Sequence, residues 1–365
     1  MLEQLAETYG DAAIGAAGGL ALGVLFGCLA RRSAFCMRSA VVDTVRGAGG
    51  SRLPLWLLAL GTAIAGVQAC LLAGLVQAET IRLINGSGSL SAAAFGGVLF
   101  GAGMVLARGC VSRLIVLSSG GNLRAVVTLL LFVGVAYATM KGPLAGARTA
   151  IAGLVPLDGA LNLNLLAHSG LGNVAGAGFG LLVVAAALLL GIRRGLGAGR
   201  TLAGLGIGLA VAAAYAITAF VQSISFDPQP VRGLSFIAPA VNSVAAVLAP
   251  ATVKPDFELL LVPGVLIGAF VTALLARDLR IEWFHTPLHA LRHGAGAALM
   301  GFGGVLAGGC SMGNGLTGFA VFSTTAIVAL GGMWLGAGLT DWLVDRPRAA
   351  PVAHEDLSAL ATAKA

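Results

Sequence analysis

Charged residues are scarce in this chain of 365 residues: they make up 10% of it, whereas 58% of the residues are hydrophobic. A water-soluble domain cannot bury so much apolar surface, so the composition indicates a protein whose solvent is a lipid bilayer. Aromatic residues are few as well, at 6%, but glycine reaches 55 residues. Because small residues let membrane helices approach closely, we expect an all-α polytopic membrane protein.

The apolar runs lack Asp, Glu, Lys, Arg and His except near their ends. A proton pump with an acidic relay needs carboxylates in the middle of its spans, so the sequence argues against that class. A membrane serine protease would need a buried base beside its serine, but the five histidines all lie in loops or in the C-terminal tail. They are His168, His285, His289, His293 and His354.

The polar residues that are present also limit what the chain binds. The net charge of +7 comes from arginines in short loops between apolar runs, which is a topology signal, and we expect no nucleic-acid partner. Five cysteines are scattered among apolar segments and do not form a disulfide framework. Thiolates can bind copper(I), but the sequence has no CxxC pair, and we expect neither a metal site nor a cofactor.

Ten apolar runs divide the chain, and nine of them are interpreted as membrane crossings. A crossing takes about 20 residues, since an α-helix rises about 1.5 Å per residue. The run 237–250 is shorter and is bounded by Pro239 and Pro250, so we interpret it as re-entrant. The expected crossings are 12–30, 54–77, 92–109, 123–140, 174–192, 201–221, 259–276, 294–309 and 319–340.

Arginine placement predicts the orientation of the chain in the membrane. The first loop holds Arg31, Arg32, Arg38, Arg46 and Arg52. Cytoplasmic loops carry an excess of basic residues, so we expect this loop inside and the acidic N-terminus outside. Nine crossings also place the basic loop 277–292 and the C-terminus in the cytoplasm, where we expect 346–365 to form a mobile tail.

A repeated stretch indicates internal symmetry. "GAGMVLARGC" at 101–110 and "GFGGVLAGGC" at 301–310 are identical at seven of ten positions. The neighbouring spans pair at a similar offset, which predicts one transmembrane domain, 1–345, with repeats at 12–140 and 201–340. The odd span 174–192 between them makes the second repeat enter the membrane in the opposite sense. Inverted repeats of this kind are typical of transporters, whose substrate sites lie at the repeat interface.

Three cysteines share one position relative to this pattern. Cys36, Cys110 and Cys310 each stand nine residues after a glycine, at the point where an apolar run gives way to polar residues. Symmetry predicts a fourth such position near Phe236, where no cysteine stands. The alternative is that the glycines only help helices to pack, with cysteine as one more small apolar residue. Packing alone does not explain the common placement of the three cysteines.

The residues after these cysteines favour broken helices and anion binding. Glycine, serine and asparagine are frequent there, and irregular backbone at membrane depth must face protein or a water-filled cavity. Exposed N–H groups and the start of a following helix suit an anion. The supporting residues expected at the site are Arg38, Arg108, Gly109, Arg113, Gly309, Ser311 and Asn314. For Arg108 and Arg113, a role as topology markers is an equally open alternative.

At "RRSAFC" (31–36), "ARGC" (107–110) and "GGCSMGN" (308–314) the chain resembles the YeeE/YedE family, which includes bacterial thiosulfate uptake proteins. The resemblance implies a nine-span fold with pseudo-symmetric halves. It also implies that Cys36, Cys110 and Cys310 line a central path and pass thiosulfate along by transient S–H contacts. A small cytosolic sulfur-carrier protein is an implied partner. The second motif departs from the family, since Arg113 stands where a glycine is expected, which could alter the substrate or the inner gate.

Three functional hypotheses follow. The leading one is an inner-membrane permease, and not an enzyme, that imports thiosulfate or a related sulfur-containing anion past weak thiol sites, since conduction requires that ions leave easily. The second is a membrane-embedded sulfur-transfer or redox protein that forms a persulfide or disulfide, with Cys36 as the nucleophile because cations lower a thiol's pKa. The third is a transporter of a selenium compound.

Two connecting segments carry weaker signals. The basic and aromatic stretch 276–294 is typical of an interfacial helix on the inner leaflet. The stretch 141–173 is expected to be a long extracellular loop that could shape a funnel.

Overall fold

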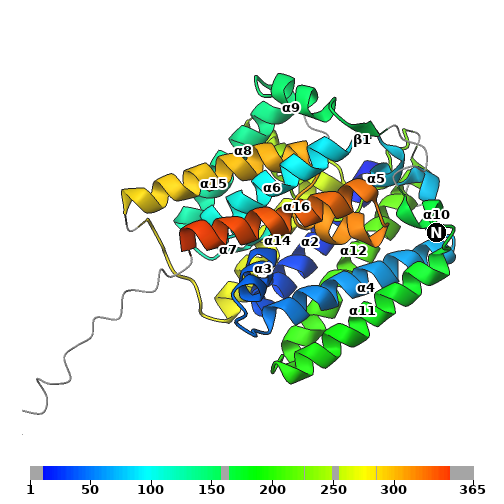
Figure 1. The fold of residues 1–365 in the computed structure, drawn as a ribbon, viewed down its shortest axis with the longest axis horizontal. Helices are drawn as coiled ribbons and strands as arrows, with labels where there is room; N and C mark the ends of the chain where they lie inside the picture. The colour runs from blue at the N-terminus through cyan, green and yellow to red at the C-terminus, as the bar shows by residue number, and fades with distance from the viewer. Residues whose placement is uncertain (1–10, 158–163, 226, 249–254, 285, 346–365) are drawn as a thin grey trace, which may run out of the picture.

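The computed structural model describes residues 11–157, 164–225, 227–248, 255–284 and 286–345, and these residues are predominantly helical. The strands among them are β1 (Gly88–Ser89) and β2 (Pro156–Leu157), which pair antiparallel. Figure 1 shows the long helices packed side by side as a bundle, with short helices at its ends. The predicted all-α polytopic architecture is therefore confirmed.

Eight helical segments of the described chain are long and apolar enough to cross a membrane. The helices in them are α2 (Asp11–Ser33) with α3 (Met37–Val45), α4 (Arg52–Leu72), α6 (Leu90–Leu106) with α7 (Val111–Ser118), α8 (Leu123–Lys141), α11 (Asn173–Arg193), α12 (Ala198–Ile224), α14 (Phe257–Leu275), and α16 (Thr324–Thr340) with η4 (Asp341–Asp345).

The ninth expected crossing, 294–309, corresponds to α15 (Pro287–Leu306), which is 20 residues long. It is long enough, but it is not apolar enough to be counted among the eight segments that could cross a membrane. The reason is in its first two turns, where His289, Arg292 and His293 interrupt the apolar run. The helix nevertheless packs along both α6 and α8 within the bundle. The 237–250 run forms the short α13 (Ile237–Leu248), of 12 residues, as expected for a segment that does not cross.

Corresponding helices of the two halves make reciprocal contacts. The first half contributes α2, α3, α4, α6, α7 and α8, and the second half contributes α12, α13, α14, α15, the π-helical turn η3 (Gly313–Gly318) and α16. In chain order, α2, α4, α6 and α8 of the first half correspond to α12, α14, α15 and α16 of the second. Helix α2 packs on α14, and their counterparts α12 and α4 pack on each other in the same way. Likewise α6 packs on α16, and their counterparts α15 and α8 pack on each other. Such an exchange of partners supports the predicted repeats. Their boundaries and opposite membrane orientation stay predictions.

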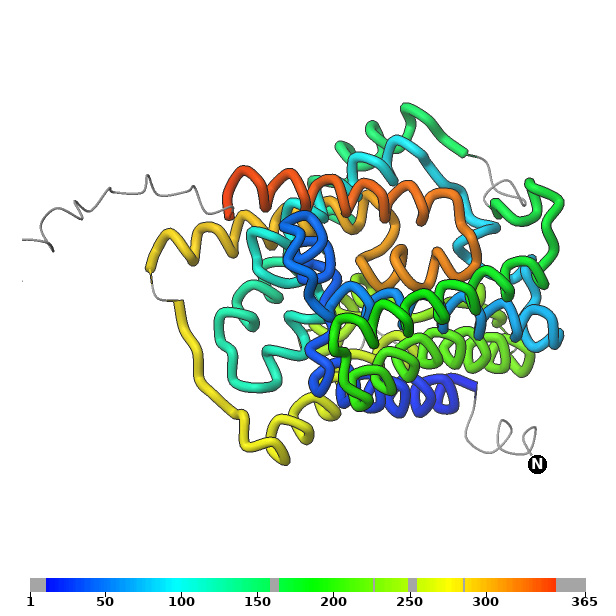
Figure 2. Tube along the Cα trace, turned by 60° about the horizontal axis from the view of Figure 1, so that its bottom comes forward, coloured from blue at the N-terminus to red at the C-terminus, as the bar shows by residue number. Residues whose placement is uncertain are grey.

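Helix α11 stands apart from this exchange, since it packs along α4 at the edge of the bundle (Figure 1). The tube in Figure 2 shows that α2 begins at one end of the bundle, whereas α16 finishes at the other. The two halves enclose a core of buried side chains.

Glycines create the closest helix contacts. A Cβ atom on Gly19, Gly23 or Gly27 of α2 would overlap a carbonyl oxygen of α14. In α6, a Cβ atom on Gly97 or Gly101 would overlap a carbonyl oxygen of α16 in the same way. Backbones that touch need residues without side chains, as expected for membrane helices. Packing therefore accounts for these glycines, and the cysteines need a separate explanation.

The predicted interfacial helix at 276–294 is wrong. Helix α14 ends at Leu275, the following residues up to Phe284 are not helical, and α15 begins only at Pro287. The segment is instead pinned to the turn between α7 and α8, where the Arg280 N–H donates to the Gly120 carbonyl at 3.1 Å. Proline at the first turn of α15 and the Thr286 hydroxyl, which accepts from the His289 N–H, fix the later start.

The expected loop at 141–173 has structure of its own. It contains α9 (Ala145–Ala152), strand β2 and α10 (Leu165–His168), while 158–163 lie outside the described residues. The predicted mobile tail, 346–365, lies outside them too. That the 141–173 segment is extracellular stays a prediction.

Candidate functional site

Three helices end in the same way before the three motif cysteines. Helices α2, α6 and α15 are each followed by a residue with left-handed backbone: Ala34 (φ 53°), Arg108 (φ 55°) and Gly308 (φ 74°). The N–H of the next residue then reaches back to the carbonyl five positions earlier, at 3.0–3.2 Å. This hydrogen bond closes the helix end, as in a Schellman motif. The cysteine follows two residues after the left-handed one.

Each of these cysteines also starts the next helical turn. The Cys110 carbonyl accepts from the Leu114 N–H at 2.9 Å, and the Cys310 carbonyl accepts from the Asn314 N–H at 2.8 Å. Cys36 makes the corresponding bond at the start of α3. Phe236 does so at the start of α13, so it occupies the fourth equivalent position without a thiol. The nine-residue spacing from glycine to cysteine thus corresponds to a helix end, a tight break and a new helix.

The breaks bring the sulfur atoms into one buried region. The thiol of Cys36 lies close enough to the thiol of Cys110 for the two to interact, and Ser311 lies close to Cys110 as well. Cys310, next to Ser311, accepts backbone hydrogen bonds from Gly313, at 3.5 Å, and from Phe236. All five cysteines of the chain are free thiols. Cys36 is 8% exposed, whereas Cys110 and Cys310 are 1% and 0% exposed.

Serine hydroxyls accompany the thiols, and the sequence analysis missed two of them. Ser39 lies close to Cys36, and the Ser112 Oγ lies 3.3 Å from the Cys110 Sγ. In the sequence, a serine follows each motif cysteine within three residues, and this pattern could have identified them. These hydroxyls give each site a stronger hydrogen-bonding group than the thiol itself.

The other two cysteines lie outside this region. The Cys28 thiol donates to the Gly268 carbonyl at 3.3 Å, in the packed interface of α2 and α14. Cys70 is partly buried near the end of α4 and packs against the hydrophobic core. Both are matched controls for the three motif cysteines.

Asn314 holds the break after α15 together. Its side-chain amide donates to the Ala307 carbonyl at 3.1 Å and to the Gly309 carbonyl at 3.0 Å. A Cβ atom on Gly309 would lie 2.9 Å from the Asn314 Oδ1, so glycine is needed where these groups meet. Gly109 is less constrained, because a Cβ atom there would make only ordinary contacts at 3.4 Å or more. The donor groups of Asn314 are therefore used within the fold.

Tyr215 and Thr317 were not anticipated from the sequence. The Thr317 hydroxyl donates to the Leu234 carbonyl at 2.6 Å, and the fully buried Tyr215 hydroxyl donates to the Thr317 carbonyl at 3.2 Å. These bonds tie η3 to α12 and to the stretch before α13. A tyrosine within an otherwise Ala- and Gly-rich span was the only sequence signal.

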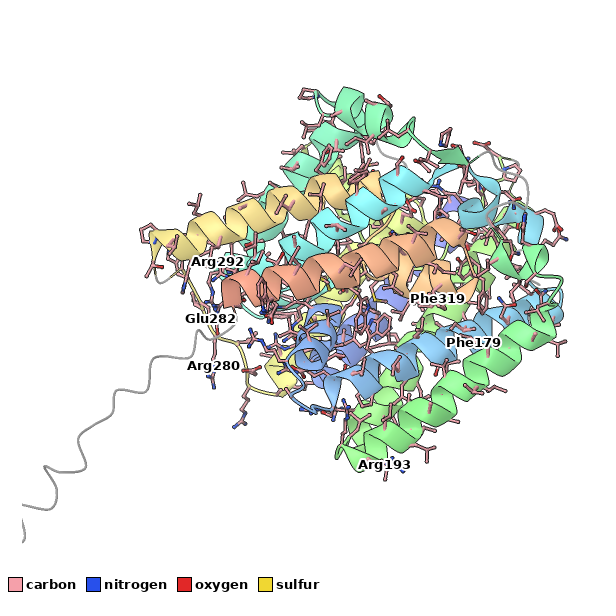
Figure 3. The ribbon with its side chains drawn as sticks, in the orientation of Figure 1. Phe179, Arg193, Arg280, Glu282, Arg292 and Phe319 are labelled. Atoms are coloured by element: carbon pink, nitrogen blue, oxygen red, sulfur yellow. The ribbon has the colours of Figure 1, made fainter. Side chains whose placement is uncertain are left out.

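Arg38 and Arg108 both interact with Asp345. Arg38 pairs with Asp345 at 3.4 Å, and Arg292 pairs with the same carboxylate at 2.7 Å. Arg108 is exposed and acts electrostatically on Asp345. A neighbouring pair joins Arg46 to Asp341 at 2.7 Å. Figure 3 shows Arg292 at the end of the bundle where α16 finishes, together with Arg280 and Glu282.

Arg113 has a different setting. It lines a cavity of about 250 Å³ and is close enough to Cys36 to act on its thiol electrostatically. The cavity lies where the end of α2, helix α7 and the segment after α14 meet. Its lining is Arg31, Ala34, Arg113, Leu117, Gly120, Asn122, Asp278, Arg280 and Glu282.

A second cavity, of about 310 Å³, lies in the region of η1 (Ala78–Thr80) and α5 (Arg82–Asn85). Helix α5 is at the end of the bundle opposite to the start of α15 (Figure 1). The lining is Glu79, Thr80, Arg82, Asn85, Gly86, Gln222, Pro228 and Pro230. The two cavities use equivalent parts of the two halves, namely the end of α2 or α12 and the segment after α14 or α4. Within the described residues, no three His, Cys, Asp or Glu side chains form a group that could hold a metal ion.

A polytopic helical protein with broken helices, buried free thiols and a cavity near each end belongs among the membrane transporters. The sequence profile of the family described as Sulphur transport matches residues 32–339. The chain belongs to this family, whose description and relatives are those of transporters and not of enzymes.

Two curated relatives carry the same name. Thiosulfate transporter TsuA of Spirochaeta thermophila is 27% identical over 345 residues, which cover 90% of this chain and 98% of that protein. Thiosulfate transporter TsuA of Escherichia coli K12 is 35% identical over 112 residues, 31% of this chain. That second match spans about a third of the E. coli protein, 32% of its length.

Proposed function

We propose that this protein is a permease that imports thiosulfate, or a closely related sulfur-containing anion, across the bacterial inner membrane. The single observation that carries the proposal is the buried cluster of Cys36, Cys110 and Ser311, with Cys310 next to it. The names of its relatives support thiosulfate as the anion. A selenium analogue of the same shape and charge would meet the same groups.

In this proposal the thiols and the helix starts act together. The first N–H groups of α3 and α7, each preceded by a cysteine, present a partial positive charge to an anion. The thiols are weak, polarisable donors that contact the terminal sulfur of thiosulfate. Serine hydroxyls at the same sites replace part of its water shell. Because every contact is weak, the anion leaves each site as easily as it enters, which conduction requires.

The proposed orientation places the end of the bundle near Arg280 and Arg292 in the cytoplasm. Arg193 lies at the end of α11 toward the same side (Figure 3). An excess of arginine at one end supports a cytoplasmic face there, with the start of α2 outside. The second cavity, beside α5, then opens outward and receives the anion. A small cytosolic sulfur-carrier protein is the proposed partner on the inner side.

Radiolabelled thiosulfate uptake tests the function. The chain is expressed in a bacterial strain without its own thiosulfate uptake system, and each variant is compared at equal membrane content. We expect Cys110→Ala and Cys310→Ala to reduce uptake close to background, and Cys28→Ala and Cys70→Ala to leave it unchanged. Wild-type uptake no higher than that of an empty vector would overturn the proposed substrate. Full uptake in both motif-cysteine variants would overturn the thiol relay.

Competition identifies the anion. Unlabelled thiosulfate should suppress uptake of the labelled ion at lower concentration than sulfate or sulfite, because only thiosulfate carries a terminal sulfur for the thiols. Stronger suppression by a selenium oxyanion would assign the selenium alternative instead.

A further inference from the structure

We propose that the cavity beside Cys36 is a binding site for a small divalent oxyanion, and that Arg113 supplies its charge. The site deepens the proposed function, and rests on it, because the transported anion is its ligand. Arg113 lies on α7, and its side chain is half-buried at the cavity wall. A cavity of about 250 Å³ is several times the ~30 Å³ that one water molecule occupies, which leaves room for a partly hydrated anion.

The carboxylates in the wall already have cationic or amide partners. Asp278 accepts from Arg31 at 2.8 Å, and Arg280 lies 3.8 Å from it. Glu282 accepts from the Asn122 amide at 2.6 Å. It is also paired with Arg124, which stands just outside the cavity. The two negative charges of the lining are thus neutralised by groups other than Arg113.

Arg113 has no such partner. None of the hydrogen bonds or ion pairs found among the described residues uses its guanidinium group, although the residue is partly buried. A cation in that position is stabilised by a counter-ion, and a guanidinium binds an oxyanion by two parallel hydrogen bonds. A monovalent halide would gain less, because it has half the charge and cannot accept in that paired geometry. The wall therefore selects small divalent oxyanions.

The site joins the thiol cluster at its most exposed member. Ala34 lines the cavity two residues before Cys36, and Cys36 is the only motif cysteine with more than 1% exposure. Arg113 acts electrostatically on that thiol. An anion that leaves Cys36 thus meets Arg113 next, which makes the cavity the last binding site before the proposed cytoplasmic exit.

Cysteine labelling tests the site without relying on transport. Leu117 lines the cavity one helical turn after Arg113, and Leu117→Cys places a reactive thiol in the wall. The detergent-purified protein is treated with two methanethiosulfonates of similar size, one carrying a sulfonate and the other a trimethylammonium group. Mass spectrometry of the peptide containing position 117 gives both rates. We expect the anionic reagent to react faster, and Arg113→Gln to reduce the ratio of rates roughly tenfold at low salt.

Three comparisons make the test specific. Arg113→Lys keeps the charge and should keep most of the preference. Arg193→Gln removes an exposed arginine at the end of α11 and should change nothing. Sulfate should slow labelling at position 117 when Arg113 is present, but not in the Arg113→Gln variant. Sulfate is the protecting ion because thiosulfate itself attacks these reagents. Size-exclusion profiles confirm that each variant is folded.

The outcomes separate the two proposals. An unchanged ratio in a folded Arg113→Gln variant would overturn the anion site, whatever the uptake assay shows. An Arg113-dependent ratio in a protein that takes up no thiosulfate would support the site and overturn the proposed substrate. If the anion site and thiosulfate uptake are both observed, Arg113→Gly should raise the thiosulfate concentration needed for half-maximal uptake. This substitution introduces the glycine expected at the second motif.

Discussion

The thiols of Cys36 and Cys110 lie close enough to interact with each other, although one precedes α3 and the other precedes α7. One helix break by itself could not bring two thiols into contact. The contact exists because two helix ends with the same geometry face each other in the core. Both thiols are free, so the pair can be closed chemically.

Oxidation of this pair should block transport reversibly. A mild thiol oxidant applied to membranes is expected to join Cys36 to Cys110, because these two thiols interact in the folded protein and so lie near each other. Two thiols per molecule should disappear in a thiol titration, and labelled uptake should fall close to background. Dithiothreitol should restore both. In Cys110→Ala the same treatment should produce no disulfide between these positions, and a full loss of two thiols there would contradict the assignment.

Gly19→Ala should destabilise the bundle severely. The new Cβ atom would overlap the Phe257 carbonyl of α14, so the two helices must separate or shift. Overpacking of this kind costs about 1–3 kcal/mol, and more where backbone is the obstacle. Thermal unfolding in detergent measures the loss. Gly134→Ala in α8 is the matched control, since nothing lies within 4 Å of its added Cβ, and it should be neutral or slightly stabilising. Equal unfolding temperatures in the two variants would refute the close contact.

Asn314→Asp should be worse than Asn314→Ala. The amide donates to two buried carbonyls, and alanine leaves both without that donor, at a cost of about 1–3 kcal/mol for each buried group. Aspartate has the same shape but turns an acceptor toward the same carbonyls, so repulsion is added. The unfolding temperatures should follow the order wild type, Ala, Asp. A role confined to the substrate would instead lower uptake in both variants without changing their unfolding temperatures.

The sequence predicted those features of the fold that depend on residues close together in the chain. Apolar runs of span length, glycine at helix contacts and the repeated stretch before Cys110 and Cys310 each reflect a rule that applies within a few turns. The run 237–250 was predicted to be too short to cross, and α13 has 12 residues; that it is re-entrant stays a prediction. The equivalence of Phe236 with the motif cysteines was visible too, because it depends only on spacing.

The site was only partly predictable, because its contacts are long-range. Nothing in the spacing of Arg108 and Arg113, five residues apart, indicates that one belongs near Asp345 and the other beside Cys36. Their separation depends on the helix break at Arg108, whose backbone is left-handed. The mistaken helix at 276–294 has a similar cause. Its composition suits an interface, but hydrogen bonds to the α7–α8 turn hold it extended.

Asp345→Asn should destabilise the end of the bundle where α16 finishes. Asp345 is paired with Arg38 and Arg292, and its side chain is only 13% exposed. Without the carboxylate charge, two partly buried arginines lose their counter-ion, which costs about 1–3 kcal/mol after allowance for solvent. Unfolding in detergent should occur at lower temperature, and the difference from wild type should narrow in high salt because ions screen the unpaired cations.

Asp43→Asn is the control for this change. Asp43 lies 3.6 Å from Arg52, whose side chain is 59% exposed, so the pair is weak and its loss should be nearly neutral.

The comparison of Asp345→Asn with wild type also tests the role of Arg113. If Asp345→Asn leaves labelling at position 117 unchanged while it lowers the unfolding temperature, the arginines of the network stabilise the fold, and the anion preference belongs to the cavity. A higher anion preference in Asp345→Asn, which leaves Arg38 and Arg292 without their counter-ion, would mean that the whole basic face, and not Arg113 alone, attracts the anion.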